Sequence, residues 1–333
     1  MADDPVPHPR ETFALLGHET AELNFADAIA RGRLHHAWLL VGNEGLGKAT
    51  FAYRAARRLL GAPTASSLGI LGADPEHPVS RQILGRAHPD LMVLERFGDD
   101  GKPRKVIPVD DARRLAEFFS KSPAIAPHRV AIVDAADDLN NNAANAILKT
   151  LEEPPPKGIL LMVSHAPGRL AATIRSRCRR LVFRPLEDAV TASFVQSRRD
   201  LNQLDALRLA RMAQGAPGRA LTLAASGALA MDDAARELLL QAPQFDETLA
   251  LTLSDRFKGG DGMLQFSLLL ERISEQVHEL VLNRVGEGAH PLDRWAQAWE
   301  TLKGMPREVE ALNLDRVDAF YTALTELREA ARA

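Results

Sequence analysis

The stretch AWLLVGNEGLGK, residues 37–48, decides the fold of the first half of the chain. It begins with the short apolar run Ala37–Gly42 and leads into Ala49–Leu60, where apolar residues recur at helical spacing. Glycines in such a loop let backbone N–H groups converge on phosphate oxygens, the helix N-terminus adds partial positive charge, and a lysine reaches the outer phosphates. A glycine-rich turn without a ligand is the alternative interpretation. The predicted nucleotide-binding residues are Gly42, Gly45, Gly47 and Lys48.

Short apolar runs alternate with segments of helical spacing as far as about residue 184. Helices are predicted after Val106–Val109 and over Asn142–Leu151, and the second ends before Pro154–Pro156 because proline cannot continue a helix. Strands that alternate with helices predict an α/β P-loop domain, a parallel sheet with helices on both faces. Besides the first run, the predicted strands are Leu91–Glu95, Arg129–Asp134, Gly158–Val163 and Arg180–Phe183.

Strand patterns end near Pro185, and the rest of the chain has helical spacing throughout. We predict three domains: a nucleotide-binding-like α/β domain over 1–184, a small helical lid domain over 185–228 and an all-α domain over 229–333. The last domain carries aromatic side chains that fit either a core or a contact with partners. These are Phe266, Trp295, Trp299, Phe320 and Tyr321.

Composition limits the setting in which the chain works. A net charge of −3 argues against a non-specific polyanion binder, which carries a strong basic excess. The single cysteine excludes an intramolecular disulfide, and the acidic start MADDPVPHPRETF has no apolar signal-peptide region. No run approaches the roughly 18 apolar residues of a membrane span. We therefore expect a cytoplasmic protein without membrane contact.

A basic cluster lies just before the last predicted strand, in and after Thr173–Cys178. From residue chemistry alone, a solvated basic rim is favoured over a functional role for these arginines. A reactive thiol at Cys178 is a weaker alternative, because the sequence has no paired histidine signature beside it. The arginines are Arg175, Arg177, Arg179 and Arg180.

Five segments occur in an order that resembles one family. They are GRLHHAWLLVGNEGLGK (32–48), HPDL (88–91), residues 106–113, NAANAILKTLEEPP (142–155) and TIRSRC (173–178). Together they resemble the delta-prime family of bacterial clamp-loader subunits, which are AAA+ proteins of the DNA polymerase III holoenzyme. The resemblance covers about the first 220 residues, and the helical remainder resembles a clamp-loader collar in length and pattern only.

The resemblance implies an AAA+ domain, a lid, and a collar that joins five subunits into a ring. The implied partners are the gamma/tau motor subunits and a delta subunit, with the sliding clamp and primed DNA reached through the complex, in the cytoplasmic, nucleoid-associated replisome. It also implies that Arg177, within Ser176-Arg177-Cys178, enters the ATP site of the adjacent motor subunit as an arginine finger. Such an arginine stabilises charge that develops on the γ-phosphoryl group.

The sequence departs from the motor subunits at groups that ATP hydrolysis needs. Ala49 stands where a hydroxyl holds Mg²⁺, and Thr50 lies about 100° further around the helix. Asp134, which ends a predicted strand, suits a second Mg²⁺ contact or a plain strand-end turn, but Ala135 replaces the glutamate that polarises the attacking water. Gly218 stands at the implied position of a sensor arginine. We predict no ATPase activity of its own, at most weak ATP or ADP binding, and no required cofactor.

The sequence predicts no zinc site and leaves two alternative functions open. One cysteine cannot form the four-cysteine zinc site of many relatives, and His77 and His88 are more simply turn residues, so no zinc is predicted. The alternatives are an active ATPase, such as the clamp-loader motor subunit, and a P-loop metabolite kinase. The chain is expected to have an enzymatic role only as a subunit of a DNA polymerase complex, which is a nucleotidyltransferase.

Overall fold

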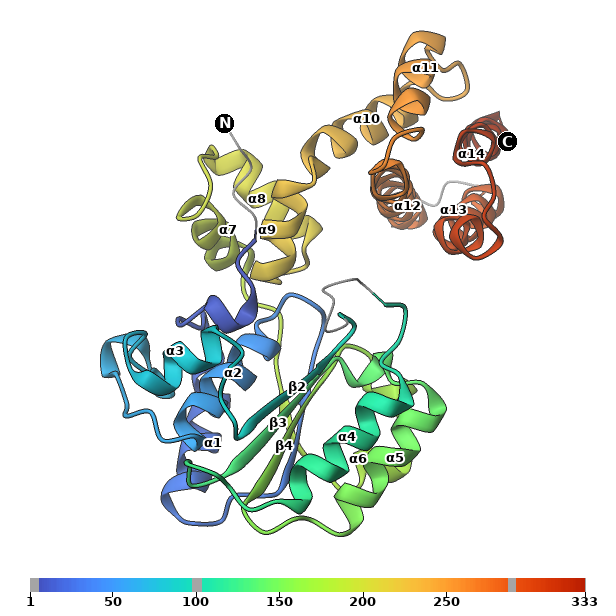
Figure 1. Cartoon of the computed structure of the whole chain (residues 1–333). Helices are drawn as coiled ribbons and strands as arrows, with labels where there is room; N and C mark the ends of the chain where they lie inside the picture. Colours follow the sequence, from blue (N-terminus) through green and yellow to red (C-terminus); the bar gives the residue numbers. More distant parts are fainter. Residues whose placement is uncertain (1–5, 98–103, 287–291, 333) are drawn as a thin grey trace. The chain divides into compact units, whose positions relative to one another are not determined.

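The computed structural model describes residues 6–97, 104–286 and 292–332. The chain divides into two compact units, Pro5–Leu221 and the residues from Thr222 onward (Figure 1). The division falls inside helix α9, Pro217–Ala225, between the two predicted boundaries. The predicted limits of the three domains, at 184/185 and 228/229, stay a prediction.

A five-stranded sheet in the order β2-β3-β4-β1-β5 forms the centre of the first unit. All strand pairs are parallel, and β1 lies between β4 and β5 with Trp38 opposite Leu161 and Arg179. β1, β3 and β4 read as almost continuous apolar runs because both sheet faces are covered. The strands are β1 (Ala37–Val41), β2 (Leu91–Glu95), β3 (Arg129–Asp134), β4 (Gly158–Ser164) and β5 (Arg179–Val182).

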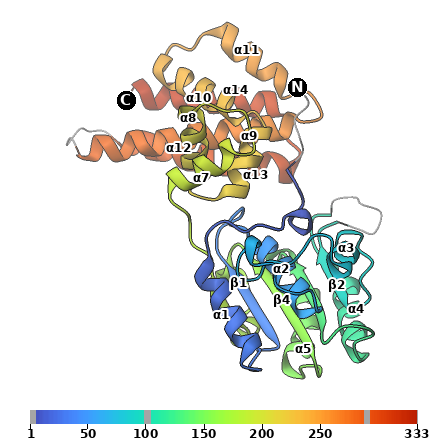
Figure 2. The same ribbon diagram turned by 90° about the vertical axis from the view of Figure 1, so that its left-hand side faces the viewer.

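Helices cover both faces of this sheet, as predicted. Trp38 and Leu40 of β1 belong to one core cluster, with Phe25 and Phe51 from helices α1 and α2, and Leu39 belongs to the cluster on the other face. Figure 1 shows α1 to α3 on one side of the strands and α4 to α6 on the other, and Figure 2 views the unit from the first side. The helices are α1 (Glu19–Ala30), α2 (Lys48–Leu59), α3 (Pro78–Leu84), α4 (Val109–Ser120), α5 (Asn141–Glu152) and α6 (Ala172–Arg175), with the 3-10 turns η1 (Pro9–Glu11), η2 (Ser66–Leu68), η3 (Ala136–Asp138) and η4 (Pro167–Arg169).

Two short helices, α7 (Asp188–Gln196) and α8 (Gln203–Met212), follow the sheet and pack against each other ahead of α9. Leu186 and Gly215 connect the strand segment to α9, since the Leu186 N–H donates to the Gly215 carbonyl at 2.9 Å. A Cβ at Gly215 would lie 2.2 Å from the Leu186 carbonyl oxygen, so only glycine fits there.

The second unit consists of helices. In its core Phe257 meets Phe266 and Phe320 edge-on, at ring-centroid distances of 5.5 and 5.2 Å, and all three side chains are fully buried. Trp295 is buried too, while Tyr321 is 40% exposed. Most of the aromatic side chains noted in the sequence therefore pack within the unit. The helices are α10 (Ala228–Gln241), α11 (Glu247–Arg256), α12 (Gly262–Gly286), α13 (Asp293–Leu312) and α14 (Arg316–Arg332).

The predicted fold class is confirmed in its architecture: an α/β domain with a parallel sheet and helices on both faces is followed by small helices and an all-α region. Among the described helices, none combines the length and apolar character needed to cross a membrane.

Candidate functional site

The predicted phosphate loop connects β1 to α2 at the carboxyl edge of the sheet. Gly42, Gly45 and Gly47 have φ values of +149°, +79° and +84°, which explains why the loop needs glycine at these positions. Gly47 is the residue before α2, so the loop leads directly into a helix N-terminus. Asp134 ends β3 at the same edge of the parallel sheet. The structure therefore brings the predicted nucleotide-binding residues to one edge.

Lys48 is folded back onto its own loop. Its Nζ donates to the carbonyl oxygens of Gly42 and Asn43 at 2.6 and 2.5 Å, and the residue is only 2% exposed. Burial lowers the pKa of Lys48 to about 8, against the opposing effect of Asp134. Two donors of the ammonium group are thus used within the loop that was predicted to present it to phosphate.

Asp134, the last residue of β3, is a half-buried acid whose charge acts on this lysine. Burial and the charge of Glu95 raise the pKa of Asp134 to about 6, although Lys48 acts in the other direction. The two groups therefore shift toward their neutral forms, which is what desolvation causes on both sides of a pair.

The first turn of α9 lies directly on the loop. The Gly218 N–H donates to the Gly45 carbonyl at 2.8 Å. A Cβ at Gly45 would lie 2.3 Å from the Arg219 nitrogen, and one at Gly218 would lie 3.0 Å from the Gly45 oxygen. On the other side, a Cβ at Gly47 would lie 2.6 Å from Leu15 Cδ1. The loop is therefore packed against protein on two sides.

The two alanines singled out in the sequence lie at one core cluster, with Ala135 buried in it and Ala49 half-buried at its margin. Ala135 is 3% exposed, and Ala49 packs against the same cluster. Asp137, the nearest acid after β3, accepts hydrogen bonds at both carboxylate oxygens, from Ser164 Oγ at 3.0 Å and from the His165 N–H. It ties the ends of β3 and β4 together, so its carboxylate is already engaged in structure.

His165 was not singled out from the sequence, yet it lies near the loop lysine at the end of β4. Burial lowers its pKa, and the charge of Lys48 adds to that effect. Its Nδ1 is buried without a hydrogen-bond partner. A histidine after a buried strand carries no local signal for such a position, so sequence reasoning could not find it.

Arg177 follows α6, where Ser176 is the C-cap residue. The Thr173 carbonyl accepts from Ser176 Oγ at 3.2 Å and from Arg177 Nη1 at 3.0 Å. Arg177 Nη2 lies 3.0 Å from Glu152 Oε1, and the Arg177 side chain is 36% exposed. The serine therefore shapes the turn that carries the arginine.

Arg177 and the phosphate loop lie at opposite edges of the sheet. Arg177 precedes β5, whose first residue Arg179 pairs with Trp38 near the start of β1, whereas the loop begins after Val41. Five residues at about 3.3 Å rise separate the edges by roughly 16 Å along the strands. Arg177 therefore lies at the opposite end of the strands from the loop of its own chain.

The neighbouring arginines are not equivalent to Arg177. Arg175 Nη1 donates to the carbonyls of Pro167 and Gly168 at 3.0 and 3.2 Å. The Arg179 guanidinium lies 4.8 Å from the Trp38 ring centroid. Burial raises the pKa of the Cys178 thiol to about 11, so the thiolate needed by a reactive cysteine is scarce at neutral pH.

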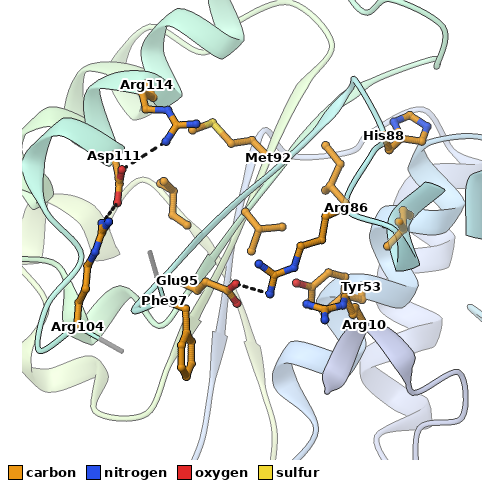
Figure 3. A pocket seen from close by; sticks show the side chains of 14 residues that line it. Arg10, Tyr53, Arg86, His88, Met92, Glu95, Phe97, Arg104, Asp111 and Arg114 are labelled. Carbon is orange, nitrogen blue, oxygen red and sulfur yellow. Dashed lines mark hydrogen bonds and ion pairs between the residues drawn. The ribbon is translucent and has the colours of Figure 1, made fainter. Parts of the chain in front are cut away.

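A cavity of about 240 Å³ lies along the outer strand β2 (Figure 3). None of the predicted site residues lines it, but its lining includes Glu95, which pairs with Asp134 across β2 and β3. Its carboxylates are paired: Arg86 lies 2.9 Å from Glu95, and Arg104 and Arg114 lie 3.1 and 3.6 Å from Asp111. The cavity is therefore next to the predicted site through Glu95, whose charge acts on Asp134.

The residues considered for zinc serve local structure instead. His77 Nδ1 accepts from the Val79 N–H as the N-cap of α3, and His88 Nδ1 accepts from the Asp90 N–H. Within residues 6–97, 104–286 and 292–332, no three His, Cys, Asp or Glu side chains are grouped to hold a metal ion.

The family profile described as "DNA polymerase III, delta subunit" matches residues 17–187, just over half of the chain. The chain belongs to this family. Its delta-prime relatives include one from Pseudomonas aeruginosa, 38% identical over 148 residues, which is 44% of this chain and 43% of that protein. Another, from Escherichia coli, is 31% identical over 202 residues, 58% of this chain and 55% of the relative.

The delta-prime resemblance inferred from the sequence is confirmed by these matches. A gamma/tau subunit of DNA polymerase III from Mycobacterium tuberculosis is also similar, at 32% identity over 180 residues, 54% of this chain and 29% of that protein. The matched part spans about half the length of the two delta-prime relatives.

Proposed function

We propose that this delta-prime family member is a clamp-loader subunit that supplies Arg177 in trans to the ATP site of a neighbouring motor subunit. Through the complex it helps to load the sliding clamp onto primed DNA. The observation that carries the proposal is the position of Arg177, partly exposed and at the sheet edge opposite its own phosphate loop. This position supports a role for the arginine on a different molecule.

The chain's own loop supports a role without ATP hydrolysis. Ala49 and Ala135 lack the hydroxyl and the carboxylate that the reaction uses, and the Lys48 ammonium is bonded to loop carbonyls. The contact between Gly218 and Gly45 covers the loop from the lid side. We infer no required cofactor and at most weak nucleotide binding.

The partners follow from the same proposal. Gamma/tau proteins match this chain over the same kind of domain, which supports a ring built from related subunits. We propose a hetero-pentamer of this chain with gamma/tau and delta subunits, working in the cytoplasm on primed DNA. The helices from α10 to α14 are proposed as the ring-forming collar.

The test is steady-state ATP hydrolysis by the reconstituted complex, stimulated by clamp and primed DNA. Arg177→Ala is expected to lower the rate at one site without preventing assembly, and Arg177→Lys is not expected to rescue it, because lysine lacks the planar fork that grips phosphate. Arg180→Ala is the matched control, since Arg175 and Arg179 have structural contacts of their own. Equal losses for Arg177→Ala and Arg180→Ala would mean a diffuse basic patch instead of a finger.

A further inference from the structure

The last residue of α5, Glu152, faces the arginine of the proposed finger. Its Oε1 lies 3.0 Å from Arg177 Nη2, and the Thr173 carbonyl holds Nη1 at 3.0 Å. Helices α5 and α6 contact each other, so the carboxylate and the turn that carries Arg177 belong to one packed corner. Both terminal nitrogens of the guanidinium therefore have partners within the chain.

This pairing conflicts with the proposed action on phosphate. A guanidinium grips a phosphate group best through two parallel N–H donors, and it stabilises developing charge best when no carboxylate neutralises it. The side chains of Arg177 and Glu152 are 36% and 53% exposed. Because exposed ion pairs are weak and screened by salt, a phosphate group can displace this carboxylate at small cost.

We propose that Glu152 is a positioning residue that holds the Arg177 guanidinium in a parked position until the γ-phosphoryl group of the neighbouring subunit takes its place. The inference rests on the proposed function, because it assigns a control to the same arginine. The carboxylate keeps the finger ordered at the rim and lowers its effective charge in the resting complex. ATP hydrolysis in the neighbouring subunit then requires Arg177 to exchange the Glu152 carboxylate for the γ-phosphoryl group.

The experiment uses the full reconstituted complex with Glu152→Gln, an isosteric change at an exposed position. Removing the competing charge is expected to raise clamp- and DNA-stimulated ATP hydrolysis about two- to fivefold at low salt, the range set by a weak exposed pair. The increase is expected to shrink as ionic strength rises. Glu153→Gln, which removes the adjacent charge, is expected to leave the rate unchanged.

The double variant Glu152→Gln/Arg177→Ala tests whether Glu152 acts through Arg177. If Glu152 acts through Arg177, the double variant hydrolyses ATP at the rate of Arg177→Ala alone. An unchanged or lower rate for Glu152→Gln, with Arg177→Ala still impaired, overturns the parking role and leaves the finger intact. An Arg177→Ala complex with full activity overturns both. A rate increase without salt dependence also contradicts the inference, because a purely structural change would not be screened.

Discussion

The backbone N–H of Gly218 donates to the carbonyl oxygen of Gly45 at 2.8 Å, which joins the first turn of α9 to the middle of the phosphate loop. Gly45 has no room for a side chain, because a Cβ there would lie 2.3 Å from the Arg219 nitrogen, and a Cβ at Gly218 would make a tight contact at 3.0 Å from the Gly45 oxygen. A loop fixed in this way is rigid and partly covered. The contact gives a physical basis for treating this chain's loop as a structural element.

The isolated protein is expected to hydrolyse ATP no faster than background. The hydroxyl and carboxylate are missing at Ala49 and Ala135, and Lys48 is bonded to Gly42 and Asn43. Phosphate release from the purified chain measures this directly. Lys48→Ala is expected to change neither that rate nor clamp loading by the assembled complex. Turnover like that of an isolated motor subunit, lost in Lys48→Ala, would show that the loop is catalytic.

Asp90 is expected to contribute strongly to the stability of the first unit. Its fully buried carboxylate accepts from the N–H groups of Ala124, Ile125 and Ala126 at 2.7, 2.9 and 3.0 Å. Asn at this position keeps the shape but loses the charge and places an NH₂ among donors. Asp90→Asn is expected to lower the free energy of unfolding by about 2–4 kcal/mol.

Denaturant unfolding followed by Trp38 fluorescence, with Trp295 and Trp299 replaced by Phe, measures this loss within the first unit. Exposed Asp110→Asn is the control, expected within about 0.5 kcal/mol of the parent. Burial alone would raise the pKa of Asp90, but the three N–H donors and Arg129 hold it below its ordinary value. Its stabilisation is therefore present above that ordinary value, about 3.8, and is lost as the pH falls through the folded-state pKa. Equal stability of Asp90→Asn and Asp110→Asn would refute this role.

Asp134 is expected to give the opposite pH dependence. Its pKa in the folded chain is raised from 3.8 to about 6, so the folded state binds the proton more tightly than the unfolded state does. The loss of folding stability caused by ionised Asp134 is therefore absent below about pH 4, grows as the pH rises to about 6 and stays constant above that. Asp134→Asn is expected to raise stability at pH 7.5, because it removes a carboxylate whose ionisation is disfavoured by burial. The gain is about 1–2 kcal/mol, less than the pKa shift alone implies, since Lys48 loses a partially compensating charge.

The same Trp38-only background measures this effect at pH 7.5 and pH 4.5. The difference between Asp134→Asn and its parent is expected to shrink at the lower pH, whereas Asp110→Asn shows no such change. A variant less stable than its parent at pH 7.5 would mean that the charge of Asp134 supports Lys48 by more than its burial costs.

The helices α10 to α14 are expected to be required for joining the ring. They form a compact unit with its own aromatic core of Phe257, Phe266 and Phe320. A chain that ends at residue 228 is expected to keep the fold around Trp38 but to elute apart from the motor and delta subunits in size-exclusion chromatography. Co-elution of this truncated chain with them would assign the ring contacts to the α/β part.

The sequence by itself determined the five strands of the first unit and the helices α2, α4 and α5, whereas α1, α3 and α6 were not predicted from it. The predicted strand Arg129–Asp134 matches β3, and the predicted helix Asn142–Leu151 matches α5 to within one residue at each end. These features are local: apolar runs, helical spacing, prolines and glycines act on the backbone within a few residues. The glycines also indicated the loop, and Gly45 has the positive φ that glycine adopts readily.

Only the tertiary structure decided what the site residues contact. Lys48 turns back to its own loop, Gly218 lies on Gly45, and Arg177 meets Glu152. Each pairing joins groups whose side chains or turns are placed by different elements, and no spacing in the sequence records the direction in which a long side chain points. The position of Arg177 at the end of the strands opposite its own phosphate loop likewise follows from the parallel register of β1 and β5. Local patterns fix the elements because backbone preferences are short-range, whereas contacts between elements depend on packing across the whole sheet.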